Sequence, residues 1–291
     1  MIIGIFFVFL VFLAGILFFW WGYRENQHLV VTRYQIHAKE LPLAFYGSKI
    51  AFLSDLHNNS FGENNQKLKE TLLAEKPDLV LIGGDMLVGK PGASYAVALE
   101  LVLWIKEHFP MIYGMGNHEY RVRQNTVFYQ TLYQEYAEEL KKKEIELLDN
   151  QRRYWEKDGE HIVIYGLTIG QYYYKRLKIE QMSREYITDC LGKREKGFSI
   201  LLAHNPVHFS AYAQWGASLV LSGHNHGGVM QLPFLGGVIS PNYRLFPKYD
   251  VGAFYKGNST MLLSAGLGSH TLPFRFFNPP ELLMIQLQGE K

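Results

Sequence analysis

Short apolar runs alternate with polar turns and amphipathic stretches over most of the chain. A short apolar run bounded by turn residues is typical of a buried strand, whereas apolar positions three and four residues apart are typical of a helix. This alternation of strands and helices predicts a largely parallel sheet with helices on its faces. The predicted strands are 49–54, 78–82, 111–115, 161–167, 198–203 and 218–222, and the predicted helices are 64–76, 94–108 and 126–146.

The pattern changes after Val229, where no further helical period occurs. The remaining apolar runs predict a sheet meander, so we expect an α/β fold in which two sheets pack together with helices outside. The runs of this last part are 229–232, 251–255, 260–264 and 282–287.

The first 23 residues contain no charged side chain, and 2–21 is an almost continuous apolar run. About 20 helical residues span the roughly 30 Å hydrocarbon core of a bilayer. The basic region and small-residue cleavage site of a secretory signal are lacking, and Trp20, Trp21 and Tyr23 lie where an aromatic belt would meet water. We therefore expect 1–23 to be a single-pass transmembrane anchor. The alternative is a buried core helix, which the missing polar face disfavours.

Arg24, Arg33 and Lys39 follow the apolar run, and no Lys or Arg precedes it. The positive-inside rule then places the rest of the protein on the cytoplasmic face. We expect 24–48 to be a linker that leads into the fold, and 49–291 to form one domain, because its length is typical of a single α/β unit.

Composition excludes several classes of protein. The net charge of +2 gives no sign of a nucleic-acid partner, and nothing in the sequence predicts a protein partner. The hydrophobic and charged fractions, 48% and 19%, are those of a folded protein. The single cysteine, Cys190, excludes an internal disulfide and a zinc site built from cysteines.

Five of the predicted strands end in clusters of Asp, Asn and His. The crevice outside the carboxyl ends of parallel strands is the usual ligand site of an open α/β sheet, so we expect these clusters to converge. One Asp or His at a strand end would be read as a cap or turn residue, but five clusters indicate a site. They are Ser54-Asp55-Leu56-His57, Gly83-Gly84-Asp85, Gly116-Asn117-His118-Glu119, Ala203-His204-Asn205 and Ser222-Gly223-His224-Asn225-His226-Gly227-Gly228.

Carboxylate, amide and imidazole groups together suit Mn, Fe, Zn or Co. The candidate ligands are too many for one tetrahedral ion and suit two ions about 3.5–4 Å apart that share a carboxylate. Two such ions generate hydroxide from bound water and neutralise phosphate oxygens. The candidates are Asp55, His57, Asp85, Asn117, His204, His224 and His226.

The motifs resemble those of the calcineurin-like metallophosphoesterase superfamily: Asp-x-His, Gly-Asp, Gly-Asn-His-Asp/Glu, a lone His and Gly-His-x-His, in this order over 55–226. The resemblance implies a four-layer α/β/β/α sandwich, here preceded by a transmembrane helix, that hydrolyses a phosphate ester or pyrophosphate bond with a metal-activated hydroxide. It also implies that His118 is the catalytic histidine. We expect Glu119, the next residue, to orient its neighbours and not to bind a metal. It implies ligands Asp55, His57, Asp85 and His226 for one metal, and Asp85, Asn117, His204 and His224 for the other.

The C-terminal part resembles the bacterial membrane-associated branch of this superfamily, in the motifs Gln231-Leu232-Pro233 and Phe246-Pro247-Lys248-Tyr249-Asp250 among others. That branch includes UDP-2,3-diacylglucosamine pyrophosphatases, so the resemblance implies a phosphorylated or nucleotide-linked lipid substrate. The alternatives are a soluble phosphomonoester, phosphodiester or phosphoprotein substrate, and a non-catalytic membrane-bound scaffold.

Two further segments are candidates for contact with such a lipid. The stretch 172–178 interleaves aromatic and cationic residues, which suits anionic headgroups at a membrane surface but also an ordinary solvated helix start. The stretch 232–249 forms either a lid or rim beside the site or a packed connection. The candidate substrate-binding residues are Lys175, Arg176 and Arg275, the last as a phosphate clamp.

Overall fold

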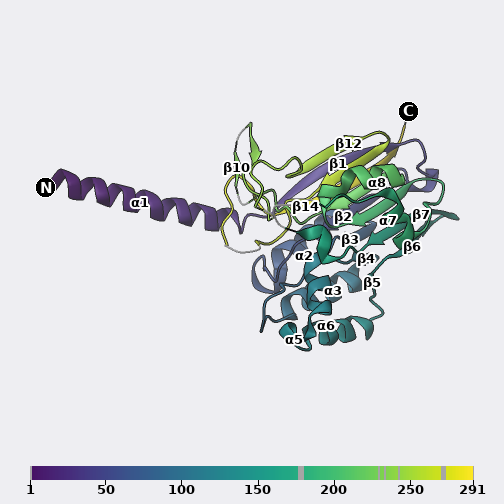
Figure 1. Cartoon of the computed structure of the whole chain (residues 1–291), viewed down its shortest axis with the longest axis horizontal. Coiled ribbons are helices and arrows are strands. Elements are labelled where there is room, and N and C mark those ends of the chain that lie inside the picture. The colour runs from purple at the N-terminus through teal and green to yellow at the C-terminus, as the bar shows by residue number, and fades with distance from the viewer. Residues whose placement is uncertain are drawn as a thin grey trace.

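The computed structural model describes residues 2–175, 180–228, 230–232, 234–241, 243–269 and 273–290. Two six-stranded sheets pack face to face, and helices cover the outer face of each sheet (Figure 1). The predicted four-layer α/β/β/α arrangement is confirmed.

The first sheet has the strand order β1-β14-β2-β3-β4-β5. Strands β2, β3, β4 and β5 are parallel, whereas β14 runs antiparallel to β2 and parallel to β1. The carboxyl ends of β2, β3 and β4 therefore lie at one edge of the sheet. The strands are β1 (Val30–Ala38), β2 (Lys49–Leu53), β3 (Leu79–Ile82), β4 (Met111–Gly114), β5 (Leu147–Leu148) and β14 (Glu281–Gly289).

The second sheet has the order β12-β13-β9-β8-β7-β6, with parallel pairing from β13 to β7 and antiparallel strands at both edges. A short hairpin of β10 (Gln231–Leu232) and β11 (Gly236–Gly237) stands apart from it. The strands of the second sheet are β6 (Gln151–Lys157), β7 (Glu160–Leu167), β8 (Ser199–Ala203), β9 (Leu219–Ser222), β12 (Gly252–Lys256) and β13 (Ser259–Leu263).

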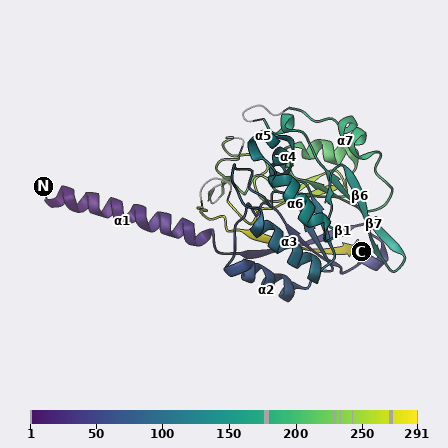
Figure 2. The ribbon, with the colours of Figure 1, turned by 90° about the horizontal axis from the view of Figure 1, so that it is seen from below.

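Each sheet buries both of its faces. In β2, Ile50 and Phe52 point into the layer between the sheets, and Ala51 and Leu53 point to the helices outside. A strand that is buried on both faces needs apolar residues at every position, which explains the continuous apolar runs. Helices α2 (Gln66–Glu75), α3 (Ala96–His108) and α6 (Leu132–Lys141) cover the first sheet (Figure 2), and α7 (Arg184–Leu191) and α8 (Phe209–Trp215) cover the second.

The range 24–48, which we expected to be a linker, contains a strand of the first sheet. Val30–Ala38 forms β1, which pairs with β14 over its whole length. The partner strand lies at the other end of the chain, so no local pattern indicates this pairing. The predicted meander after residue 229 is also wrong, because β12 and β13 join the second sheet while β14 inserts between β1 and β2 of the first.

The predicted helix 126–146 is interrupted in the structure. It consists of α5 (Thr126–Tyr129) and α6, with β5 following. Gln130 between the two helices has φ 54°, a left-handed conformation that cannot continue a right-handed helix. Strand β6 was not predicted, because its residues at the edge of the second sheet are mostly exposed and charged.

Helix α1 (Ile2–Glu25) projects away from the two sheets (Figures 1 and 2). Its length and apolar composition are those of a membrane span, a character that an N-terminal signal sequence shares. The end of α1 nearest the sheets is packed: the Phe18 ring stacks on Phe276 at 4.1 Å between centroids, and Trp21 meets Phe277 at 4.7 Å. The main-chain N–H of Arg275 donates to Gly22 O at 3.1 Å.

Candidate metal centre

The five polar clusters converge at the carboxyl ends of parallel strands from both sheets. Three clusters follow β2, β3 and β4 of the first sheet, and two follow β8 and β9 of the second. Asn117 and His118 begin α4 (Asn117–Gln124) directly after β4. Asn117 is partly exposed, and the other candidate ligands and His118 are buried.

The main chain of the loops is strained where it presents these side chains. Positive φ angles occur at Asp55 (55°), His57 (48°), Asp85 (56°), His224 (72°) and His226 (50°). Such a conformation costs a non-glycine residue about 1 kcal/mol or more and persists where the surrounding structure imposes it, commonly at functional sites. Five of the seven candidate ligands are therefore held in conformations that an ordinary turn would avoid.

Glycines let the loops approach the two carboxylates. A Cβ at Gly223 would lie 2.1 Å from Asp55 Oδ2, and one at Gly116 would lie 2.2 Å from Asp85 Oδ1. Neither position can carry a side chain without displacing an acidic group of the centre.

The two carboxylates share a set of imidazole neighbours. Asp85 Oδ1 accepts from the N–H of His118 at 2.7 Å, and Oδ2 lies 3.2 Å from His204 Nε2 and 3.8 Å from His57 Nε2. Asp55 Oδ1 lies 3.4 Å from His226 Nε2, 3.7 Å from His204 Nε2 and 3.8 Å from His57 Nε2. Three overlapping groups can each hold an ion: Asp55–His57–His226, His57–Asp85–His118 and Asp85–His204–His224.

Three histidines are oriented by carbonyl groups of the main chain. A carbonyl oxygen can only accept, so each Nδ1 carries a proton and Nε2 is the nitrogen that each ring directs into the centre. This is the usual arrangement of histidines that bind metals. The Nδ1–carbonyl distances are 3.2 Å for His57 and Leu87, 2.9 Å for His204 and Gly83, and 3.0 Å for His226 and Gly268.

His118 has the opposite arrangement. Its Nδ1 accepts from the N–H of Gly89 at 2.7 Å, so the proton of the neutral ring is on Nε2. Arg121 supports this contact, because its Nη2 donates to Gly89 O at 3.0 Å and lies 3.4 Å from His118 Nδ1. Nε2 is 3.9 Å from Asp85 Oδ2, so His118 presents a proton at the edge of the centre.

Buried polar atoms support a metal at this position. His224 Nε2 and Asn117 Oδ1 are buried and have no hydrogen-bond partner among the described residues. A buried acceptor without a partner costs about 1–3 kcal/mol, and a divalent cation would remove that cost for both atoms. The set of carboxylate, imidazole and amide donors fits such a cation.

The charges of the centre also favour a cation. Burial lowers the pKa of His204, but the carboxylates of Asp85 and Asp55 outweigh burial and raise it to about 10. Burial and the neighbouring His204 lower the pKa of His224 to about 3, so this imidazole remains neutral. The carboxylates therefore hold a positive charge on His204, which a bound metal cation would replace, next to the neutral imidazole of His224.

Glu119 organises the loops from behind the centre, as the sequence analysis expected. Oε2 accepts from the N–H groups of Asp85 at 2.8 Å and Gly116 at 3.2 Å, and Oε1 accepts from Met86 N at 2.8 Å. The N–H of Leu87 and the hydroxyl of Tyr113 also donate to Oε1. Burial and the Asp85 carboxylate raise the pKa of Glu119 to about 7, while the donors favour its ionised form.

Two of the three predicted substrate-binding residues lie among the described residues, and both have partners within the protein. Arg275, predicted as a phosphate clamp, is buried, and its guanidinium donates to the carbonyls of Ala265 at 2.9 Å and Gly268 at 2.6 Å, so it braces its own loop. Lys175 is exposed, 3.3 Å from Glu180. Arg176 lies outside the described residues.

Two residues next to the centre were not among the predicted site residues, although Tyr174 lies in the stretch 172–178. Asn278 Nδ2 donates to the carbonyls of His226 at 2.7 Å and Gly228 at 2.5 Å, which fixes the last loop of the centre. The Tyr174 ring lies 5.1 Å from the His224 ring. The only sequence signal for Asn278 is its position before two prolines, which favours a rigid turn.

Known proteins resemble this chain in sequence. The model of the family described as calcineurin-like phosphoesterase matches residues 48–228. The uncharacterised metallophosphoesterase YkuE of Bacillus subtilis is 28% identical and aligns with 92% of this chain and 88% of its own length. The phosphodiesterase YaeI of Escherichia coli is 25% identical, over 82% of each chain. The crystal structure of the phosphopantetheinyl hydrolase PptH of Mycobacterium tuberculosis superposes with a TM-score of 0.43, at 11% identity, over 75% of this chain and 89% of that one.

Proposed function

The chain belongs to the calcineurin-like phosphoesterase family, and from this premise we propose that it hydrolyses the phosphate ester or pyrophosphate bond of a membrane-resident lipid substrate. Phosphoester hydrolysis follows from the family. The lipid substrate, the metal ligands and the role of each residue are our proposals, and they rest on the geometry of the centre and of α1.

Two divalent cations would be held by the convergent loops. When bound, such ions supply a nucleophile from water at neutral pH and neutralise phosphate oxygens. Asp85 Oδ2 lies 3.8 Å from His57 Nε2 and 3.2 Å from His204 Nε2, which supports its role as the shared ligand. The donors suit Mn, Fe, Zn or Co. We assign Asp55, His57, Asp85 and His226 to one cation, and Asp85, Asn117, His204 and His224 to the other.

His118 would act on the leaving group. The N–H of Gly89 holds Nδ1 as an acceptor, so Nε2–H can donate to the oxygen that gains charge when the ester bond breaks. Asp85 Oδ1 fixes the main chain of His118 through its N–H at 2.7 Å. The donor is thereby placed relative to the carboxylate that we assign to both cations.

The observation that carries the lipid proposal is a hydrogen-bonded connection between α1 and the centre. Arg275 N donates to Gly22 O at 3.1 Å, and Arg275 Nη2 donates to Gly268 O at 2.6 Å. The same Gly268 carbonyl orients His226 at 3.0 Å. If α1 spans a bilayer, the centre lies close to its surface, where tethering raises the effective concentration of a lipid substrate. Such tethering gives no advantage with a freely soluble substrate.

Truncation tests this proposal, because the apolar span can be separated from the packed end of α1. Deletion of 2–17 removes the span but keeps Phe18, Trp21 and Gly22, which contact the loop of Arg275. Deletion of 1–24 removes both. We expect the shorter deletion to lower turnover of a pyrophosphate-linked lipid in vesicles far more than turnover of bis(p-nitrophenyl) phosphate in solution. Equal losses on the two substrates would refute the lipid proposal.

UDP-diacylglucosamine is our specific candidate for the substrate, and the cytoplasmic face our candidate for the location. The proposed location rests on the positive charges of Arg24, Arg33 and Lys39, which follow the span. Protease treatment of inverted membrane vesicles tests the location. Digestion of the domain supports the cytoplasmic face, and protection from digestion contradicts it.

A further inference from the structure

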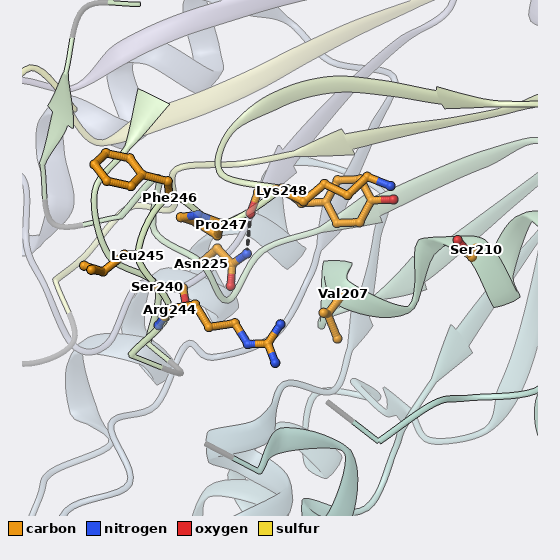
Figure 3. A pocket seen from close by; sticks show the side chains of 10 residues that line it. Val207, Ser210, Asn225, Ser240, Arg244, Leu245, Phe246, Pro247 and Lys248 are labelled. Carbon is orange, nitrogen blue, oxygen red and sulfur yellow. Dashed lines mark hydrogen bonds between the residues drawn. The ribbon is translucent and has the colours of Figure 1, made fainter. Parts of the chain in front are cut away.

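A cavity of about 550 Å³ opens beside the last loop of the metal centre (Figure 3). Val207, next to α8, lines one side, and the segment that follows the β10–β11 hairpin lines the other. Nothing in the assignment of the metals or of His118 uses this space.

The cavity is joined to the metal centre through Asn225. This residue lies between His224 and His226 in the chain and contributes to the cavity wall. Its Nδ2 donates to the carbonyl of Tyr249 at 2.6 Å, which ties the far wall to the metal loop (Figure 3). A ligand in the cavity would therefore contact the residue that separates two of the proposed metal ligands in the chain.

The charged side chains on the wall are cationic. Arg244 and Lys248 line the cavity, and none of the described residues that line it is an Asp or a Glu. Figure 3 shows the Arg244 guanidinium extending across the space toward Val207. Guanidinium and ammonium groups bind phosphate and carboxylate oxygens through charge-assisted hydrogen bonds, so the cavity is suited to an anionic group.

Large apolar side chains also line the cavity. Leu245 and Phe246 line the cavity and are 67% and 52% exposed. Phe234 and Leu235, at the tip of the β10–β11 hairpin, are also exposed. Figure 1 places this hairpin on the side of the domain from which α1 emerges. Exposed apolar groups that gather in this way mark a site of contact with an apolar ligand or a membrane.

We propose that this cavity is a substrate subsite for an anionic amphiphile. Arg244 and Lys248 bind a second anionic group of the substrate, and Leu245 and Phe246 contact its apolar chain. The inference rests on the proposed hydrolysis at the neighbouring centre, and it narrows the substrate to molecules that carry another anionic group beside the reacting phosphate and a chain that reaches toward α1. A small monoanionic ester has neither feature and gains nothing from the subsite.

Three substrates of the full-length protein distinguish contacts made by the cationic side chains from contacts made by the apolar side chains. CDP-diacylglycerol in mixed micelles has two phosphates and a chain, ADP-ribose has two phosphates without a chain, and bis(p-nitrophenyl) phosphate has one phosphate and no chain. The charge variant is R244Q with K248Q, and the apolar variant is L245S with F246S. The matched control is K142Q, directly after α6, because the Lys142 side chain is exposed and pairs with Glu139.

We expect the charge variant to lower kcat/KM on both two-phosphate substrates by roughly tenfold or more relative to bis(p-nitrophenyl) phosphate. The apolar variant should lower it on the lipid alone, and K142Q should match the wild type on all three. Equal losses on all three substrates, or no loss on any, would overturn the subsite. The charge variant could lose activity on both two-phosphate substrates while the apolar variant keeps wild-type activity on the lipid. That result would overturn the proposed contact with an apolar chain and identify the ligand as a soluble anion.

A binding measurement separates this inference from the proposed function. With His118→Ala as background, the charge variant should weaken the affinity for intact CDP-diacylglycerol by roughly tenfold, as measured by titration calorimetry. Unchanged affinity overturns the subsite even if the enzyme is active. Wild-type protein that binds two metals but hydrolyses none of the three substrates counts against the proposed function alone.

Discussion

Substitution of Glu119 by Gln tests how the centre is held together, because it replaces one carboxylate oxygen by an amide nitrogen that cannot accept. Oε2 accepts from the main-chain N–H groups of Asp85 and Gly116, and Oε1 accepts from two further N–H groups and from the Tyr113 hydroxyl. In either orientation of the amide, its NH2 group faces at least two buried N–H donors.

The size of the effect follows from those donors. Each buried N–H that loses its acceptor costs about 1–3 kcal/mol, so two of them lower the free energy of unfolding by about 2–6 kcal/mol. One of the donors is the N–H of Asp85, the residue assigned to both cations. Displacement of this loop should weaken metal binding by roughly 10- to 100-fold, as loss of a supporting contact does at other metal sites.

Two measurements check this prediction. Denaturant unfolding of the detergent-solubilised protein gives the free energy, and mass spectrometry after dialysis against a metal buffer gives the metal content. Tyr136→Phe is the control, because it removes one hydroxyl from the same network, 3.1 Å from the Tyr113 hydroxyl, without depriving any main-chain donor. We expect a cost of about 1 kcal/mol and normal metal content in the control. If Glu119→Gln behaved like Tyr136→Phe, the role given to Glu119 would be wrong.

Four further changes give distinct expected outcomes. His118→Ala should lower kcat on bis(p-nitrophenyl) phosphate by roughly 10²- to 10⁴-fold with unchanged metal content; unchanged turnover contradicts its role as donor. Removal of the metals with a chelator should lower the unfolding midpoint and abolish turnover. Titration of metal into the metal-free protein should restore turnover only at two equivalents per chain; full turnover at one equivalent contradicts the paired centre. Asn278→Ala removes the donor to His226 O and Gly228 O and should weaken metal binding by about tenfold or more, as measured with a competing chelator; wild-type affinity contradicts this. Gly223→Ala places a Cβ 2.1 Å from Asp55 Oδ2 and should lower metal content, whereas Gly15→Ala, where a Cβ meets nothing within 4 Å, should not; equal metal contents would contradict the need for glycine at 223.

The convergence of the candidate ligands could be predicted because it follows from the direction of the strands. Each buried strand is an unbroken apolar run, so the first polar residue after it is easily located, as Asp55 is after β2. Parallel pairing then brings these ends together. The left-handed conformations that aim Asp85 and His226 could not be predicted, because glycine alone signals positive φ reliably in a sequence.

Other features depended on partners far away in the chain. Arg275 follows Pro273 and Phe274 in a pattern that suits a binding residue, but the carbonyls that surround it belong to a loop whose path only the fold determines. The contact of Asn278 with His226 O joins positions with no common sequence pattern. The same limitation explains why the strand in 30–38 was assigned to a linker.

The position of β14 between β1 and β2 has a consequence for the nascent chain. Both neighbours are synthesised early, but the strand that separates them is made only after the whole second sheet. Until then β1 has no partner and the edge of β2 is open, a state in which an unpaired edge invites pairing with other chains. A chaperone that shields this edge, or the proximity of the membrane to which we assign α1, would protect the growing polypeptide until the last strand emerges from the ribosome.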